Sequence, residues 1–120
     1  MTGDIIQGEA WIAEFPGAVT VCDRTGIILY MNDRSAAVFA ADGGRALVGC
    51  NLLDCHPEPA RSTTAELLAR PRVNVYTIEK RGVKKLIYQA PWYRSGECQG
   101  LVELSLEIPA DMPHFVRESG

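Results

Sequence analysis

Three residues that lie close together in the sequence have side chains that could take part in chemistry: Cys50, Cys55 and His56. Their spacing, Cys-x4-Cys-His, is a longer variant of the motif in which two thiols form thioethers to a haem and the histidine binds its iron. Covalent attachment normally follows export, and the first residues have neither the basic start nor the apolar run of a signal peptide. The structural alternative is a turn in which the His56 imidazole bonds backbone near a helix start.

A catalytic pair of Cys55 and His56 is the enzyme hypothesis at the same positions. A nucleophile needs its base within about 3 Å and a third group that orients the base, and adjacent side chains usually point apart. Zinc would need four converging ligands, and the second histidine, His114, lies near the end of the chain. We therefore expect no catalytic activity and no metal site.

The composition restricts the possible partners. The chain has 120 residues, enough for one domain, and 12 basic against 15 acidic residues give a net charge of −3. Without a basic run, neither nucleic acid nor an anionic membrane is an expected partner, and no apolar stretch has the length of a membrane span. We expect a cytoplasmic protein with reduced thiols, whose redox role is left open, at Cys22, Cys50, Cys55 and Cys98.

A hairpin and a helix cap near the N-terminus give the first elements. Asp23 to Gly26 has the residue types of a tight turn, and the β-rich segments 18–22 and 27–31 flank it. Asn32 or Asp33 then offers a side-chain oxygen to the first turn of a short apolar helix. The chain should leave the sheet at this point.

Two further helices are expected on either side of this unit. Residues 4–13 have an amphipathic pattern that ends at Pro16 and Gly17, and we expect a flanking helix there. A second helix should follow the proline-rich loop at 54–59, with Thr63 and Glu66 as a capping box and an end before Pro71.

From Val73 the apolar pattern changes to a period of two. Segments 73–80, 83–93 and 99–108 predict three strands, and the short turns at 81–82 and 94–97 make neighbours antiparallel. The fold class is thus α+β: a five-stranded antiparallel sheet with short helices on one face. We divide the chain into a flanking helix (1–15), the domain (16–108) and a tail (109–120).

On each of the last two strands, one face is more apolar than the other. If these two apolar faces lie together, they must be covered. They consist of Leu86, Tyr88, Ala90 and Trp92 on one strand, and of Val102, Leu104, Leu106 and Ile108 on the other. The N-terminal helix and the tail are the spare segments that could cover this surface, or a second subunit could do so. We expect a homodimer formed through the N-terminal helix and this outer sheet face.

The ordered set of motifs resembles a PAS domain between about Glu14 and Ile108. Four segments carry the resemblance: Asp-x-x-Gly-Ile-x-x-Tyr-x-Asn at 23–32, Leu-Val-Gly at 47–49, Leu-Leu-Asp-Cys-His-Pro at 52–57, and Gly-Glu-x-x-Gly at 96–100 running into Glu107 and Ile108. The resemblance implies a non-catalytic sensory module. It would bind a small molecule in a cavity between sheet and helices, or relay a signal through dimerisation to a signalling partner protein.

Counting from Pro91 and Gly100, the resemblance places cavity-lining residues on the polar faces of the last two strands. These candidate ligand-binding residues are Ile87, Gln89, Leu101, Glu103 and Ser105. Buried polar groups there would need hydrogen-bond partners, which a polar ligand could supply. In the alternative arrangement, Glu103 and Ser105 face solvent and Leu104 belongs to the core.

The family also bears on cofactors. Haem-binding members use a histidine on the helix after this loop, so His56 is the candidate axial ligand of a non-covalent haem, and a haem-linked redox or gas sensor is an alternative function. The light-sensing flavin branch has a reactive cysteine after a Gly-x-Asn triplet, whereas Gly49-Cys50-Asn51 is followed by Leu52. A flavin photoadduct is therefore not expected. A ligand-free protein-interaction module is the other alternative.

Overall fold

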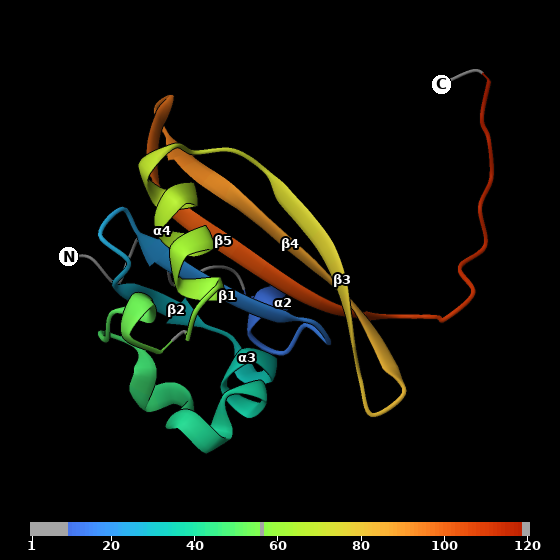
Figure 1. Cartoon of the computed structure of the whole chain (residues 1–120), viewed down its shortest axis with the longest axis horizontal. Helices are drawn as coiled ribbons and strands as arrows, with labels where there is room; N and C mark the ends of the chain where they lie inside the picture. The colour runs from blue at the N-terminus through green and yellow to red at the C-terminus, as the bar shows by residue number, and fades with distance from the viewer. Residues whose placement is uncertain (1–9, 56, 119–120) are drawn as a thin grey trace.

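The structure, a computed structural model, describes residues 10–55 and 57–118, with Cys55 described by its backbone alone. Five strands form one antiparallel sheet (Figure 1): β1 (Ala18–Asp23), β2 (Ile28–Met31), β3 (Asn74–Lys80), β4 (Val83–Arg94) and β5 (Glu97–Ile108). The helices are α2 (Ala10–Ala13), α3 (Asp33–Val38) and α4 (Ala60–Ala69), with 3-10 helices η1 (Ala40–Asp42), η2 (Gly44–Leu47) and η3 (Leu52–Cys55). The α+β fold expected from the sequence is confirmed.

The turn between β1 and β2 forms because Asp23 bonds its own backbone. Its Oδ1 accepts hydrogen bonds from Thr25 N (2.9 Å), Thr25 Oγ1 (2.7 Å) and Ile27 N (3.0 Å). Gly26 has a φ of 96°, which a glycine adopts without strain. The predicted hairpin is therefore confirmed, with β2 beginning one residue later than expected.

Asn32 makes the chain leave the sheet after β2. It is fully buried, and its Oδ1 accepts hydrogen bonds from Ser35 N and Val19 N, both at 3.0 Å. Its Nδ2 donates to the carbonyls of Ile12 (3.0 Å) and Gly17 (2.8 Å). Of the two predicted caps, Asn32 is the N-cap of α3, and Asp33 is the first helical residue.

Strand β5 is central in the sheet order β2-β1-β5-β4-β3. The register pairs Glu103 with Thr20 on β1 and with Gln89 on β4, so these three side chains share a face. We call the face that carries them the inner face: Ala18, Thr20, Cys22, Asn74, Tyr76, Ile78, Lys85, Ile87, Gln89, Leu101, Glu103 and Ser105. The outer face carries Val19, Val21, Val75, Leu86, Tyr88, Ala90, Val102, Leu104 and Leu106.

Helix α4 lies in front of the sheet in the view of Figure 1, and α3 lies below β1 in the same view. Helix α4 begins at Ala60, so the predicted capping box of Thr63 and Glu66 is wrong. The carboxylate of Glu58 instead accepts hydrogen bonds from Ser62 N (3.1 Å) and Ser62 Oγ (2.7 Å). Glu66 pairs with Arg72 beyond the helix at 2.7 Å.

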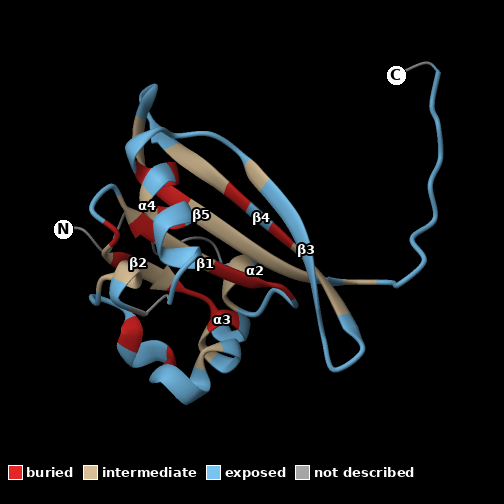
Figure 2. Cartoon of the chain, in the orientation of Figure 1, coloured by how far each residue is buried: buried red, intermediate tan, exposed pale blue. Residues whose placement is uncertain are grey.

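The core lies between the sheet and the helical segments (Figure 2). One cluster joins Cys22 and Leu101 of the inner face to Leu67 and Leu68 of α4. A second cluster contains Ile28, Met31 and Leu47. Leu52 of η3 packs against both clusters and so links the two halves of the core.

The outer face is apolar and partly exposed, with Val75 46% and Tyr88 38% exposed. Phe15, just after α2, lies with Leu106 against Gly17. The tail from 109 to 118 is exposed throughout and extends away from the sheet (Figure 1), so the tail, one of the segments that could have covered the outer face, does not cover it. Most of the predicted N-terminal helix, 4–9, lies outside the described residues.

Candidate functional site

A groove of about 610 Å³ lies between the inner face and the helices. Its floor comes from β3, β4 and β5, and its walls come from the end of α3 and the start of α4. The lining residues are Ala18, Thr20, Val38, Phe39, Pro59, Ala60, Thr63, Thr64, Asn74, Tyr76, Ile78, Lys80, Lys85, Ile87, Gln89, Glu103 and Ser105. The groove has the size and mixed chemistry of a small-molecule site.

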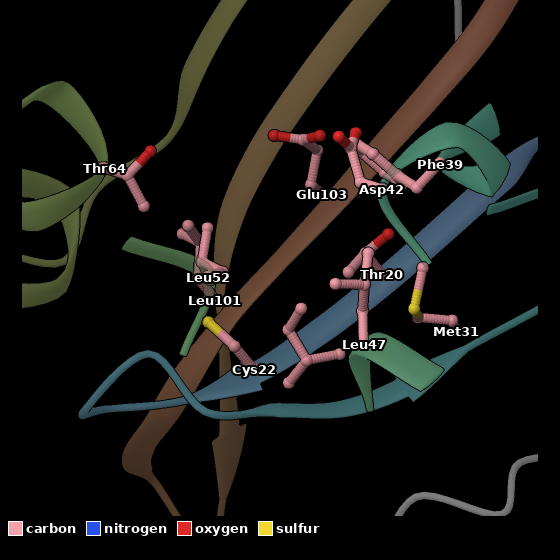
Figure 3. Close-up of a pocket in the computed structure, with 11 residues that line it drawn as sticks. Thr20, Cys22, Met31, Phe39, Asp42, Leu47, Leu52, Thr64, Leu101 and Glu103 are labelled. Carbon is pink, nitrogen blue, oxygen red and sulfur yellow. The ribbon is translucent and has the colours of Figure 1, made fainter. Parts of the chain in front are cut away.

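An inner pocket of about 50 Å³ adjoins this groove and shares four lining residues with it: Thr20, Phe39, Thr64 and Glu103. Its walls are mostly apolar (Figure 3), from Cys22, Ile28, Met31, Leu47, Leu52 and Leu101, and Asp42 also lines it. The groove and the pocket thus form one cavity with a wide part of mixed lining and a narrow, mostly apolar part. Glu103 lies where the two parts meet.

A ladder of hydrogen bonds crosses the floor of the groove from strand to strand. Asn74 Nδ2 donates to Gln89 Oε1 at 2.8 Å, and Gln89 Nε2 donates to Glu103 Oε1 at 2.7 Å. Gln89 is only 4% exposed. The ladder fixes the direction of the Glu103 side chain and leaves its carboxylate at the groove.

A second polar contact joins the cavity wall to α3. Thr20 Oγ1 and Ser35 Oγ lie 2.6 Å apart and share a hydrogen bond. Ser35 is fully buried, and its backbone N–H is held by Asn32. The cavity is therefore connected through Thr20, Ser35 and Asn32 to the Ile12 carbonyl of α2.

Two titratable groups of the inner face respond to burial and to the charge of Glu103. Burial raises the pKa of the Tyr76 hydroxyl, and the Glu103 carboxylate raises it further. Burial raises the pKa of the Cys22 thiol from 9.0 to about 11, a backbone hydrogen bond from Leu101 opposes this, and Asp23 and Glu103 add to it. Both groups are therefore neutral at physiological pH.

The structure brings the predicted residues together on the cavity floor. Ile87, Gln89, Glu103 and Ser105 line the groove, and Leu101 lines the inner pocket. The alternative with Leu104 in the core is not the arrangement found, because Leu101 contacts Leu67 and Leu68. Ligand binding by these five residues stays a prediction, and His56, the candidate haem ligand, lies outside the described residues.

Sequence reasoning missed several cavity residues: Thr20, Phe39, Thr64, Asn74 and Tyr76. The alternation of β3 gave a signal for Asn74 and Tyr76, which share a face with Ile78. Thr20 faces Glu103 through the pairing of β1 with β5, which are far apart in the chain. No local pattern predicts that contact.

No group of three or more His, Cys, Asp or Glu residues within residues 10–55 and 57–118 could hold a metal ion. No helix among the described residues is long and apolar enough to cross a membrane.

Comparisons with known proteins place this architecture. No model of a protein family and no curated protein matches the sequence. The PAS domain of BvgS from Bordetella pertussis is 26% identical, with a TM-score of 0.58, and the match covers 82% of this chain and 81% of that chain. The PAS domain of an HTR-like protein from Haloarcula marismortui is 16% identical, with a TM-score of 0.59 and coverage of 90% and 100%.

A third solved structure, of the Aer2 receptor from Vibrio cholerae, is described as a dual PAS-haem oxygen sensor. It is 22% identical, with a TM-score of 0.54, and the match covers 78% of this chain and 95% of that chain. These structures share the antiparallel sheet and short helices of this chain. The sequence resemblance, the sheet order and these matches agree, and the chain has a PAS-like fold.

Proposed function

We propose that this chain is a non-catalytic sensory module that binds a small molecule in the cavity between the inner sheet face and helices α3 and α4. The cavity carries the proposal: a groove of about 610 Å³ whose floor holds a polar ladder ending at Glu103. A shaped apolar cavity with a few directed polar groups is typical of ligand sites. The ligand would contact Ile87, Gln89, Leu101, Glu103 and Ser105, as expected from the sequence.

The contact of Thr20 with Ser35 supports coupling between the ligand and the flanking segment. A ligand that bonds Thr20 competes for the hydroxyl now paired with Ser35 at 2.6 Å. Ser35 is bonded to Asn32, and Asn32 holds the Ile12 carbonyl of α2. Binding would then change how firmly α2 is held, and a dimer or a signalling partner would read that change.

Native mass spectrometry tests ligand binding. The protein is incubated with the small-molecule extract of cells of its own source and freed of unbound compounds before measurement. We expect a non-covalent adduct on the wild type and its loss from Ser105→Phe, whose ring would occupy the groove. The matched control is Glu97→Phe, which adds the same ring at the exposed start of β5.

The adduct should remain on Glu97→Phe. Equal adducts on all three proteins would place binding elsewhere than in the groove. Bare protein in every sample would instead support the ligand-free interaction module.

The haem-linked sensor is the second candidate, because a solved structure with this fold is described as a dual PAS-haem oxygen sensor. The described cavity lining contains no histidine, so the axial ligand would be His56. An absorption spectrum after reconstitution with haem separates the candidates. A Soret band that His56→Ala removes would support haem, and its absence would support a colourless ligand.

A further inference from the structure

The charges of the cavity indicate the chemical class of its ligand. We propose that the cavity takes a small organic amine, whose protonated nitrogen bonds Glu103 and whose short apolar group enters the inner pocket. This inference rests on the proposed function, because it assumes that the cavity binds a ligand.

Glu103 has no cationic partner in the part of the chain that the structure describes. The three ion pairs there join Arg45 to Asp33, Arg61 to Asp54 and Arg72 to Glu66, all on the surface. Glu103 is half-buried, and its single hydrogen bond among the described residues comes from Gln89. A half-buried carboxylate without a counter-charge carries a desolvation cost that a bound cation would offset.

The direction of the ladder defines what the ligand must offer. Gln89 donates to Oε1 of Glu103, so the carboxylate acts as an acceptor toward the protein. An ionised carboxylate accepts about four hydrogen bonds and donates none. The remaining sites of Glu103 therefore call for N–H or O–H donors, and an ammonium group supplies three N–H donors together with the opposite charge.

The other charges of the cavity favour the same orientation of the ligand, with its ammonium group at Glu103. No basic side chain lines the inner pocket, and its second charged residue is Asp42. In the view of Figure 3, the Asp42 and Glu103 side chains lie at the same end of the pocket. The lysines of the groove, Lys80 and Lys85, belong to the β3–β4 hairpin end, and Lys85 is four residues from Gln89, about 13 Å along the strand.

The dimensions fit an amine with a short chain. The inner pocket of about 50 Å³ is lined mainly by aliphatic and sulfur-containing side chains, and it suits a few methylene groups. Thr20 and Thr64, at the junction with the groove, offer hydroxyl oxygens to N–H groups that Glu103 does not take. An anionic head at this junction would lie against the Glu103 carboxylate and bind weakly.

The test is an amide NMR titration with three probes of equal chain length: 1-pentylamine, 1-pentanol and pentanoate. We expect the amine to shift the Thr20 and Glu103 amides with an affinity about tenfold above that of the alcohol, because a charge-assisted hydrogen bond replaces a neutral one. Pentanoate should bind more weakly than either. Glu103→Gln keeps the shape of the side chain and should reduce amine affinity to that of the alcohol.

Glu107→Gln, which removes a charge from the exposed end of the same strand, should keep the tenfold preference. Equal or stronger binding of the alcohol or of pentanoate would overturn the amine assignment and leave the cavity as the ligand site. Failure of all three probes to shift any cavity amide would overturn this inference, and the proposed function would then be decided by the native mass spectrometry of Ser105→Phe and Glu97→Phe. The wild-type series decides the question even if a variant does not fold.

Discussion

Asn32 is the residue that connects the sheet, the start of α3 and the flanking segment. Its side chain makes four hydrogen bonds, two as acceptor and two as donor, and it is fully buried. If the Asn32 side chain is removed, the groups that it bonds stay buried without hydrogen-bond partners. Leaving them unpaired costs more free energy than the hydrogen bonds themselves contribute. This residue therefore fixes the local geometry through which the cavity would communicate with α2.

We expect Asn32→Ala to lower the free energy of unfolding by about 3 kcal/mol, because it removes the cap and four buried hydrogen bonds. Asn32→Ser keeps a capping oxygen for Ser35 N and should recover about 1 kcal/mol of this loss. Urea denaturation of both variants measures the difference. A loss below about 1 kcal/mol for Asn32→Ala would contradict the role given to this residue.

The Cys22 thiol makes the free energy of unfolding depend on pH in the alkaline range. The residue is 2% exposed, and burial raises the pKa of its thiol from 9.0 to about 11. The unfolded chain loses the thiol proton at a lower pH than the folded chain. The contribution of the Cys22 thiol to the free energy of unfolding is therefore complete below pH 9 and is lost as the pH rises toward 11. At 1.36 kcal/mol per pH unit, the whole loss is about 3 kcal/mol.

The measurement is the free energy of unfolding between pH 8 and 11 for wild type and Cys22→Ala. The wild-type curve should fall more steeply than the variant curve, because other titrating groups are common to both. Parallel curves would show that the Cys22 thiol ionises alike in both states.

At pH 8, the exposed thiol of Cys50 should react with a thiol reagent before that of Cys22.

The close approach of β5 to β1 depends on Gly100. A Cβ built there would overlap the Cys22 carbonyl oxygen and the Asp23 backbone, and its φ is 156°. Glycine is the residue that permits such contact between backbones. This contact positions the start of β5, and with it Leu101 and Glu103, beside the cavity.

Gly100→Ala should lower stability by about 3 kcal/mol through this overlap. Gly96→Ala is the matched control, because Gly96 also has a positive φ of 80° but nothing within 4 Å of the added Cβ. We expect Gly96→Ala to lower the free energy of unfolding by about 1 kcal/mol. Thermal or urea unfolding measures the stability of both variants. Equal losses of stability would mean that φ alone, rather than the backbone contact, makes glycine necessary at position 100.

Elements set by local chemistry were predictable from the sequence. The Asp23 turn and the Asn32 cap each depend on residues within four positions, and both were expected. Helix α4 follows the proline-rich loop as expected, but the capping box was wrongly predicted at Thr63, because the Glu58 carboxylate, just ahead of Pro59, bonds the first helical turn at Ser62. The face that lines the cavity was expected from the resemblance to PAS domains, because alternation alone left both faces of the last two strands open. Thr20 and Phe39 enter the cavity through contacts between distant segments.

Within residues 10–55 and 57–118, the outer sheet face is a surface that a second copy could cover. It is apolar, and Tyr88 and Val75 on it are 38% and 46% exposed. We propose a homodimer through this face and the N-terminal segment, since the described tail does not cover it. A surface of this kind commonly marks a protein interface.

Tyr88→Lys should shift the protein toward the monomer, because it places a charge in the centre of this face. Tyr93→Lys makes the same change near the end of β4 and should leave the mass unchanged. Sedimentation equilibrium measures both. A dimer that persists unaltered in Tyr88→Lys would exclude the outer face as its interface.

A crystal structure of the ligand-loaded protein would show whether the groove between α4 and the inner sheet face is the ligand site. We expect continuous ligand density in the groove, in contact with Glu103 and Thr20, with a short apolar part in the inner pocket. Density outside this groove, or α4 packed directly on Asn74 and Gln89 with no space between them, would contradict binding in the groove.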